Sequence, residues 1–238
     1  MVLGCCLERN VSNAQRKAFR KPRPEKSRLL AYDIIQEVNR RGGYSNLLLP
    51  QALTSSDLDE RDRAFTTELV YGTLRMQGLY DYILSRISDR PWESVDSEIV
   101  DLARMGAHQI FSMRTPPHAA LSSTVDVARK VLGEGQGSFL NALLRKASSQ
   151  ELSQWLADVE EIKDAVSRLA IIHSHPEWIV SAYFDLLKDH SRVEEELLSN
   201  NQPAEPTLVA WPGRSTQSDL LDLGGIATQF SPYGARYK

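Results

Sequence analysis

Apolar side chains recur at helical spacing along most of the chain. Before Gly42, three aliphatic residues are spaced four positions apart, namely Leu30, Ile34 and Val38. Residues three or four positions apart lie on the same face of an α-helix, so this spacing predicts a helix with one buried side. The glycine that follows the pattern is typical of a helix end.

The same periodicity predicts further helices as far as about residue 200. Their expected ranges are 45–53, 59–76, 79–87, 95–110, 116–131, 138–146, 162–172 and 179–186. No strand-like alternation occurs before residue 200, and this part of the chain is therefore predicted to be all-α. The glycine-rich run 133–137 follows a helix rather than a strand, so we interpret it as a turn between helices and not as a nucleotide-binding loop.

The pattern changes after residue 200. Two prolines and several polar side chains predict a linker, which is followed by a strand at 207–211, a short helix at 215–223 capped by Ser215 or Thr216, and a second strand at 227–231. A β-α-β fragment of this size exposes sheet edges and is too small to be a domain by itself. It is typical of the beginning of a larger α+β domain. The chain as a whole is predicted to be mainly all-α.

Composition narrows the class of protein. Of the 238 residues, 42% are hydrophobic and 25% are charged, which is ordinary for a folded protein with a core. No apolar run approaches the roughly 20 residues that span a bilayer, so no membrane partner is expected. The only cysteines, Cys5 and Cys6, are adjacent and cannot cross-link a fold. Their scarcity fits a reducing, cytoplasmic location.

Positive charge is concentrated at the N-terminus. Residues 1–28 carry eight basic and two acidic side chains, a charge of +6, whereas the rest of the chain carries −9. Residues 1–24 are therefore predicted to form a basic, disordered arm. Such an arm can tether a nucleic acid, because neutralised phosphates release counterions. A solvated tail without a ligand explains the same charge pattern equally well.

Several segments resemble a known family, in the same order along the chain. They are Arg61–Phe65 (RDRAF), Glu68–Arg75 (ELVYGTLR), Leu102–Gln109 (LARMGAHQ), Pro117–Ala120 (PHAA), Phe139–Arg145 (FLNALLR), His175–Ile179 (HPEWI) and Asn200–Pro203 (NNQP). On these residues the chain resembles the NusB-like front part of the Sun/Fmu type of methyltransferase, which makes 5-methylcytosine in 16S ribosomal RNA. The resemblance covers roughly residues 25 to 237.

The resemblance implies an order of domains. In this family a NusB-like helical domain is followed by a small ferredoxin-like RNA-recognition subdomain and then by a Rossmann-like catalytic domain. We therefore expect a NusB-like RNA-binding domain at 25–149, linker helices at 150–202 and an incomplete α+β (ferredoxin-like) subdomain at 203–238. The sequence stops inside that subdomain, so we expect everything catalytic to be missing from this chain.

No catalytic residue, cofactor or metal is accordingly expected in this chain. Methyl transfer to cytosine C5 requires a thiolate that adds to C6. The only thiols, in Cys5 and Cys6, lie in the predicted arm without an ordered pocket to activate them. S-adenosylmethionine is implied for the full-length family only. The five histidines lack a cysteine or acidic partner at zinc-binding spacing.

The predicted RNA-binding residues are all basic. They are Arg16, Lys17, Arg20, Lys21, Arg23, Arg61, Arg63, Arg104, Arg129, Lys130, Arg145 and Lys146. The pairs at 129–130 and 145–146 are expected to build one basic patch with the arm, although solvated helix faces carry such pairs too.

Glu68 lies among apolar positions and is expected to be a buried carboxylate that needs a partner. In one interpretation it forms an ion pair between helices with Arg75 or Arg104. In the other interpretation Arg61, Arg63 and Arg104 are exposed for phosphate contacts.

The preferred hypothesis is a non-catalytic part of a cytoplasmic rRNA methyltransferase that holds 16S ribosomal RNA through phosphate contacts. No DNA partner is expected. The alternative is a NusB-type transcription antitermination adaptor, whose helical domain binds RNA and a protein partner. The extension past Lys146 argues against the adaptor, because a stand-alone adaptor does not need residues 150–238. A gene remnant without function is a third hypothesis, which the exposed sheet fragment supports.

Overall fold

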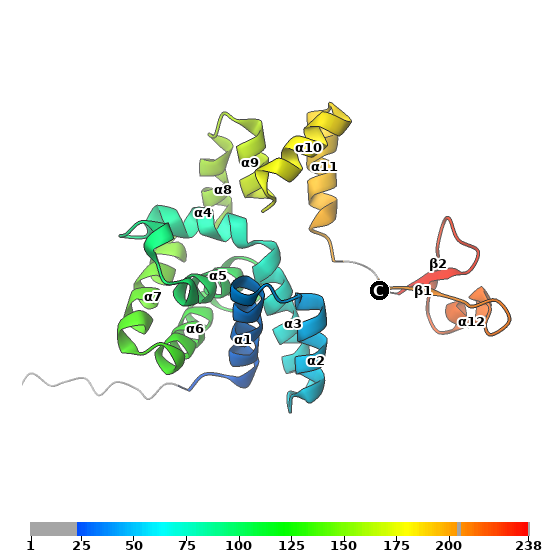
Figure 1. The fold of residues 1–238 in the computed structure, drawn as a ribbon, viewed down its shortest axis with the longest axis horizontal. Helices are drawn as coiled ribbons and strands as arrows, with labels where there is room; N and C mark the ends of the chain where they lie inside the picture. The colour runs from blue at the N-terminus through cyan, green and yellow to red at the C-terminus, as the bar shows by residue number, and fades with distance from the viewer. Residues whose placement is uncertain (1–22, 204–205, 238) are drawn as a thin grey trace, which may run out of the picture. The chain divides into compact units, whose positions relative to one another are not determined.

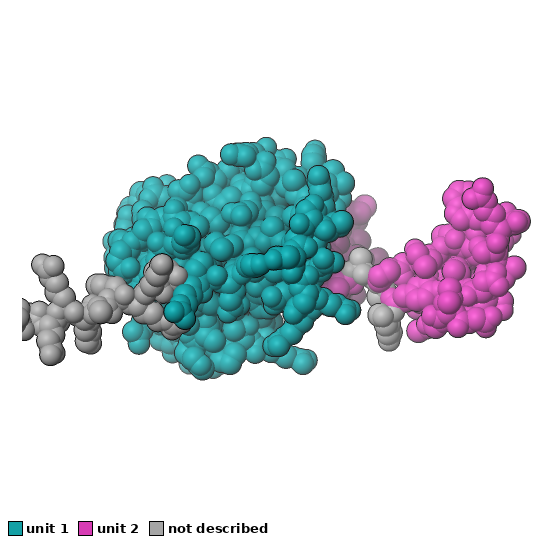
Figure 2. Space-filling model, turned by 90° about the horizontal axis from the view of Figure 1, so that it is seen from below, with its two compact units in different colours: residues 1–155 teal, residues 156–238 magenta. Residues whose placement is uncertain are grey.

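The computed structural model describes residues 23–203 and 206–237. The chain divides into two compact units, residues 1–155 and 156–238, which Figure 2 colours teal and magenta. Most of the predicted basic arm lies outside the described residues, which begin at Arg23. The domain boundaries expected at residues 149 and 202 stay predictions.

The first unit is built from α-helices and one short 3-10 helix. In its described part, the elements are α1 (Lys26–Arg41), α2 (Ser45–Ser55), α3 (Glu60–Arg75), α4 (Gln77–Ile87), the 3-10 helix (Trp92–Ser94), α5 (Ser97–Phe111), α6 (Pro117–Val131), α7 (Glu134–Ala147) and the start of α8 (Leu152–Glu160). Local signals set several of these ends. Gly42 ends α1 with a φ of 69°, a left-handed conformation that glycine adopts without strain. The Asp59 carboxylate caps α3 by accepting a hydrogen bond from the backbone N–H of Asp62.

Helix α5 lies at the centre of the first unit. It contacts α1, α3, α4, α6 and α7, and these helices surround it in Figure 1. The core around it contains fully buried side chains from each neighbour, among them Ile35, Leu69, Tyr80, Leu102, Met105, Val127 and Leu144. Because α5 is buried on most sides, its polar side chains Asp101, His108 and Gln109 are buried too, and each has a hydrogen-bond partner on another helix.

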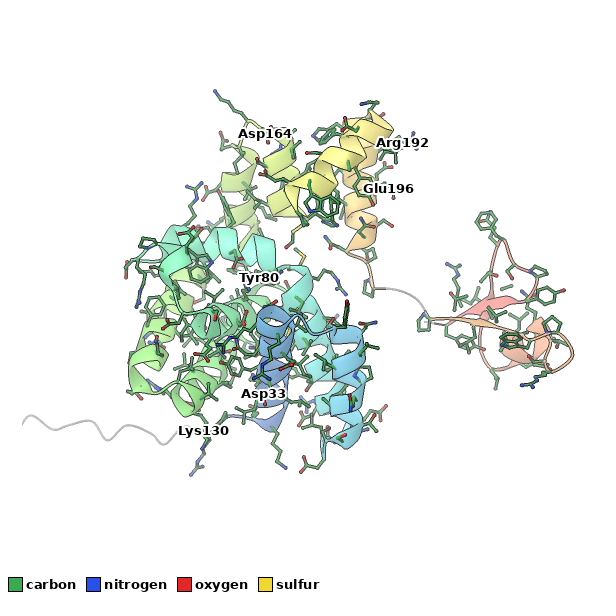
Figure 3. All side chains as sticks on the ribbon, in the orientation of Figure 1. Asp33, Tyr80, Lys130, Asp164, Arg192 and Glu196 are labelled. Atoms are coloured by element: carbon green, nitrogen blue, oxygen red, sulfur yellow. The ribbon has the colours of Figure 1, made fainter. Side chains whose placement is uncertain are left out.

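Helices α3 and α5 approach closely at Gly72. A Cβ atom on Gly72 would lie 2.1 Å from Nε2 of His108, so only glycine fits there. Nδ1 of His108 is 2.8 Å from the hydroxyl of Tyr80, which is also 2.9 Å from the hydroxyl of Ser112. Figure 3 labels Tyr80 among the helices of this unit. Burial lowers the pKa of His108 to about 4, and the charge of nearby Arg75 acts in the same direction.

The turn predicted at 133–137 is wrong beyond its first residue. Only Gly133 leaves the helical conformation, with a φ of 94°, and Glu134 already belongs to α7. Gly137 is needed inside the helix because a Cβ there would lie 2.4 Å from Cγ of Arg129 on α6. The glycines therefore allow α6 and α7 to pack closely as an antiparallel hairpin.

The helices that follow have a small core of their own. They are α9 (Ala165–Ile172), α10 (Glu177–Leu187) and α11 (His190–Asn200), and they bury Leu169, Val180, Val193 and Leu197 together. The Asn201 side chain donates a hydrogen bond of 2.8 Å to the carbonyl of His173, which ties the end of α11 to the end of α9. The sequence pattern predicted α9 and α10 but gave no range for α8 or α11.

Residues 206–237 form a small sheet with one helix. The elements are β1 (Thr207–Val209), α12 (Gln217–Asp222), β2 (Ile226–Ala227) and β3 (Gly234–Arg236), and the antiparallel sheet has the order β1-β3-β2. Thr216, one of the two predicted caps, forms a capping box with Asp219. The predicted second strand at 227–231 is wrong in extent, and β3, which pairs with both other strands, was not predicted. The prediction of a mainly α-helical fold with a small, incomplete α+β segment is confirmed.

Candidate nucleic-acid interface

A polar hollow of about 420 Å³ lies between the start of α1, the start of α3 and the segment that joins α5 to α6. Its lining residues come from these three places: Glu25, Arg28, Arg61, Asp62, Phe65, Arg114, Thr115 and Pro116. Three arginines against two carboxylates give the lining a net charge of +1. We call it the arginine hollow.

Arg28 is fixed inside the arginine hollow. Its side chain is buried, its Nη1 pairs with the carboxylate of Glu25, and its Nε donates a hydrogen bond of 2.8 Å to Oε1 of Gln109. The guanidinium carbon lies 4.6 Å from the ring centre of Phe65, a cation–π contact. Burial lowers the pKa of Arg28, and the charge of Glu25 partly offsets this. Arg28 is therefore a structural cation whose charge is already matched.

Arg61 and Arg114 are different, because both are exposed at the edge of the arginine hollow. Among residues 23–203 and 206–237, no carboxylate lies within ion-pair distance of either guanidinium. Arg61 was predicted from the sequence and Arg114 was not. Arg114 lies in the non-helical segment between α5 and α6, and only the tertiary fold brings it near the first turn of α3.

A second hollow of about 470 Å³ adjoins the same segment of chain. It is lined by Pro117, His118, Leu121, Arg145, Ser148 and Ser149. Residues 114–116 line the first hollow and residues 117–118 line the second, so the two are neighbours. Arg145 is exposed there, because the antiparallel α6–α7 hairpin brings the end of α7 to the start of α6. His118 is exposed and provides no side-chain cap for α6.

Arg104 is not exposed for phosphate contact, so for this residue that interpretation is wrong. Its Nε and Nη2 donate to the carboxylate of Asp81 at 2.8 and 2.6 Å, and its Nη1 donates to Asp101 at 3.1 Å. Only 17% of the side chain is exposed. Burial alone lowers the pKa of Arg104, but the hydrogen bonds and charge of Asp81 outweigh burial and raise it. Arg104 joins α5 to α4 as a structural ion pair.

Glu68 is not a buried carboxylate, and neither predicted arginine is its partner. Its side chain is 56% exposed, and its Oε1 lies 3.4 Å from Nε2 of His108. The sequence pattern put Glu68 on the same apolar face of the helix as Leu69. In the structure, the Glu68 carboxylate instead points toward solvent at the edge of the α3–α5 contact. A single sequence does not show which helix packs against that edge.

The other predicted basic residues are largely engaged within the protein. Arg63 donates to the carbonyls of Leu58 and Ser56 at 2.9 and 3.3 Å, just beyond α2. Arg129 pairs with Glu134 at 3.0 Å, and Lys146 pairs with Asp89 at 2.6 Å. Lys130 is exposed at the edge of the first unit (Figure 3).

The two predicted basic pairs do not form one patch. Residues 129–130 lie beside the turn of the α6–α7 hairpin, whereas residues 145–146 lie at its opposite end. At 1.5 Å per residue, the length of α7 separates them by about 20 Å.

The predicted arm joins the body beside the arginine hollow. The four arm residues Arg16, Lys17, Arg20 and Lys21 lie outside the described residues. The backbone N–H of Arg23 donates to the carboxylate of Asp126 on α6 at 3.4 Å, and two residues later Glu25 lines the arginine hollow. The root of the arm and the arginine hollow therefore share one side of the first unit.

No helix in the described ranges is both long and apolar enough to cross a bilayer. Nor do three or more His, Cys, Asp or Glu side chains gather as a metal site anywhere in the part of the chain that the structure describes.

The helical body defines the class of protein. The NusB family model matches residues 25–149, which is more than half of the chain, so this chain belongs to the NusB family. Curated relatives extend the likeness beyond those residues. The ribosomal RNA small subunit methyltransferase B of Thermus thermophilus is 32% identical over 213 residues, which cover 87% of this chain and 47% of that protein. The protein of the same name from Pseudomonas putida is 36% identical over 137 residues, 58% of this chain and 29% of that protein.

These relatives confirm the resemblance to the NusB-like N-terminal part of the Sun/Fmu type of rRNA methyltransferase. The chain spans about half the length of the curated relatives it matches. Among solved structures, PH0851 matches 91% of this chain and 49% of its own chain, with a TM-score of 0.63 and 13% identity, a likeness of fold alone.

Proposed function

We propose that this chain binds 16S ribosomal RNA as a non-catalytic part of an S-adenosylmethionine-dependent rRNA cytosine-C5 methyltransferase. The proposal rests on the family and on one observation, which is that Arg61 and Arg114 stand exposed and unpaired among the described residues at the edge of the arginine hollow. Exposed guanidinium groups without carboxylate partners are suited to phosphate oxygens.

RNA contact in this proposal has two sources. The basic arm supplies charge without a defined geometry, whereas the arginine hollow and Arg145 supply charge from the folded first unit. The body beyond residue 28 carries −9 and repels a polyanion in bulk. Binding must therefore be concentrated on the side where the arm and the arginine hollow meet.

The catalytic steps belong to residues outside this chain in the same proposal. In the run 133–137, Gly133 lies between α6 and α7, and residues 134–137 are the first turn of α7. The run is therefore not a phosphate-binding loop between a strand and a helix. Neither cysteine lies in the described residues, and we propose no nucleophile here. We propose a cytoplasmic location, in keeping with relatives that are named for a ribosomal RNA.

Deletion of residues 1–24 tests the proposal. The deletion removes six basic residues and Glu8, a net charge of five. If these charges contact phosphates, RNA affinity falls and the log–log salt slope decreases by about 3.5 to 4.5. The measurement is a filter-binding titration on a 16S fragment at several salt concentrations.

A matched control separates the arm from general charge. Arg41→Gln removes an exposed arginine at the far end of α1 from Arg28, about 20 Å away along the helix, and should leave affinity nearly unchanged. Unchanged affinity and slope after the deletion would refute the tether. Complete absence of RNA binding would refute the proposed function and favour a role through a protein partner alone.

A further inference from the structure

The arginine hollow holds both unpaired cations and an unpaired carboxylate. Asp62 lies next to Arg61 in the first turn of α3, and its backbone N–H is the group that Asp59 caps. Asp62 lines the hollow, and its carboxylate accepts no hydrogen bond from any described residue. It acts on Arg28 only through its charge.

Exposed Arg40 and Arg41 pair with glutamates at 2.8 and 2.9 Å, whereas exposed Arg86, Arg90 and Arg145 have no carboxylate within ion-pair distance among the described residues. What sets the arginine hollow apart is therefore that two such arginines line it together with the carboxylate-bearing Asp62. In the arginine hollow, no described carboxylate comes within 4.0 Å of Arg61 or Arg114, although Asp62 is the very next residue after Arg61. The donors of Arg61 and Arg114 and the acceptor of Asp62 line the same hollow without pairing with one another. A ligand that both accepts and donates hydrogen bonds would match such a lining.

The chemistry of the lining selects the ligand. A phosphodiester oxygen accepts hydrogen bonds, so it suits Arg61 and Arg114, but it cannot donate to Asp62 and is repelled by it. A ribose 2′-hydroxyl donates a hydrogen bond and stands beside a phosphate in every ribonucleotide. The deoxyribose of DNA lacks that hydroxyl and carries no hydrogen-bond donor in its place.

We propose that the arginine hollow binds one ribonucleotide unit of an RNA strand, with its phosphate on Arg61 and Arg114 and its 2′-hydroxyl on the carboxylate of Asp62. The inference rests on the proposed RNA-binding function and adds a property to it. This site selects RNA over DNA of the same sequence. Arg28, held by Glu25, Gln109 and Phe65, forms a fixed part of its lining.

The experiment compares a short single-stranded RNA with DNA of the same sequence, each titrated into the 238-residue chain. Arg114→Gln and Arg61→Gln should each weaken RNA binding about tenfold, the value of one hydrogen bond to a charged group. Each should also lower the salt slope by about 0.7. Circular dichroism confirms that each variant is folded.

Asp62→Ala tests the hydroxyl contact. It should lower the ratio of RNA to DNA affinity by roughly tenfold, because RNA loses a charge-assisted hydrogen bond while DNA loses only repulsion. Asp62→Asn keeps an acceptor oxygen and should retain part of the ratio. Glu60→Ala is the matched control, since it removes the same charge from the same turn of α3 but lies outside the hollow. It should leave the ratio unchanged.

The outcomes separate this inference from the proposed function. If Asp62→Ala and Glu60→Ala shift RNA and DNA affinity alike, the hydroxyl contact is wrong. If both arginine variants bind RNA as the wild type does, the hollow is not the phosphate site, while RNA binding by the chain still stands. If the wild type binds neither nucleic acid, the proposed function fails and this inference fails with it.

Discussion

The helical body (the described part of the first unit, residues 23–155) and the C-terminal sheet segment (residues 206–237) have similar fractions of apolar residues. They differ in whether the large apolar side chains are buried. In the first unit, large side chains such as Leu69 and Tyr80 are fully buried around α5. In residues 206–237, the buried positions are Ala210, Gly234 and Ala235, whereas Phe230 is 92% exposed and Leu223 is 74% exposed. One region has a core of large side chains, and the other has mainly local structure.

The two regions are therefore held by different forces. Burial of large side chains, worth about 1.5 to 3 kcal/mol each, stabilises the helical body. The sheet segment depends on hydrogen bonds, such as the Thr216 capping box and the 2.7 Å bond from the Tyr237 hydroxyl to the carbonyl of Leu220. Such bonds contribute only about 0.5 to 1.5 kcal/mol each and barely offset the cost of ordering the chain.

The same substitution, leucine to alanine, in both regions gives the most direct test of this difference. Leu69→Ala removes a fully buried side chain and should lower the free energy of unfolding by about 2 to 5 kcal/mol. Leu223→Ala removes an exposed side chain of the same size and should change it by less than about 0.5 kcal/mol. Urea titration followed by circular dichroism measures both. Equal losses would show that Leu223 is covered in solution.

Acid should weaken the helical body through His108. The unfolded imidazole has a pKa near 6.5 and the buried one a pKa of about 4, so between these values the unfolded chain binds a proton that the folded chain does not. The free energy of unfolding should therefore fall as the pH falls from 6.5 to 4, by up to about 3 kcal/mol from this residue. Above pH 6.5 neither state is protonated and the effect vanishes.

Two variants separate the contribution of His108 from the other effects of acid on stability. Burial raises the pKa of Asp101, for example, which acts in the opposite direction as the pH falls. His108→Gln should flatten the pH dependence, whereas His118→Gln changes an exposed histidine and should not. A profile that is the same for wild type and His108→Gln would contradict the assignment.

The sequence predicted helices well where the spacing of apolar residues along one face is sufficient to define the helix. Helices α1, α3, α5 and α6 follow from apolar spacing, and Gly42 marks the end of α1 as expected. The start of α7 was misjudged because glycine usually breaks a helix, while Gly137 is tolerated for the space that it gives Arg129. That reason lies on another helix and cannot be found in local pattern.

The candidate site was predicted less well for the same reason. Arg61 and Arg104 look alike in sequence, but Asp81 from α4 engages one and leaves the other exposed. Arg114 has no periodic signal at all, since it lies between helices. Its proximity to Arg61 depends on how α3 packs on α5, which requires tertiary information.

The smallest effect is expected from removing the sheet segment. Truncation after Gln202 deletes residues whose large apolar side chains are mostly exposed, so little burial is lost. The thermal midpoint of the remaining helices should stay within a few degrees of the full chain, as followed by far-UV circular dichroism.

Truncation after Asp189 provides the contrast, because it removes only 13 residues more, 190–202, but these include α11. Val193 and Leu197 of α11 are fully buried against α9 and α10, and their loss should melt those two helices while the first unit stays folded. If truncation after Gln202 instead abolished cooperative unfolding, the sheet segment would have to cover apolar surface on the helices. Both regions would then depend on burial of large apolar side chains, and the contrast drawn between them would be wrong.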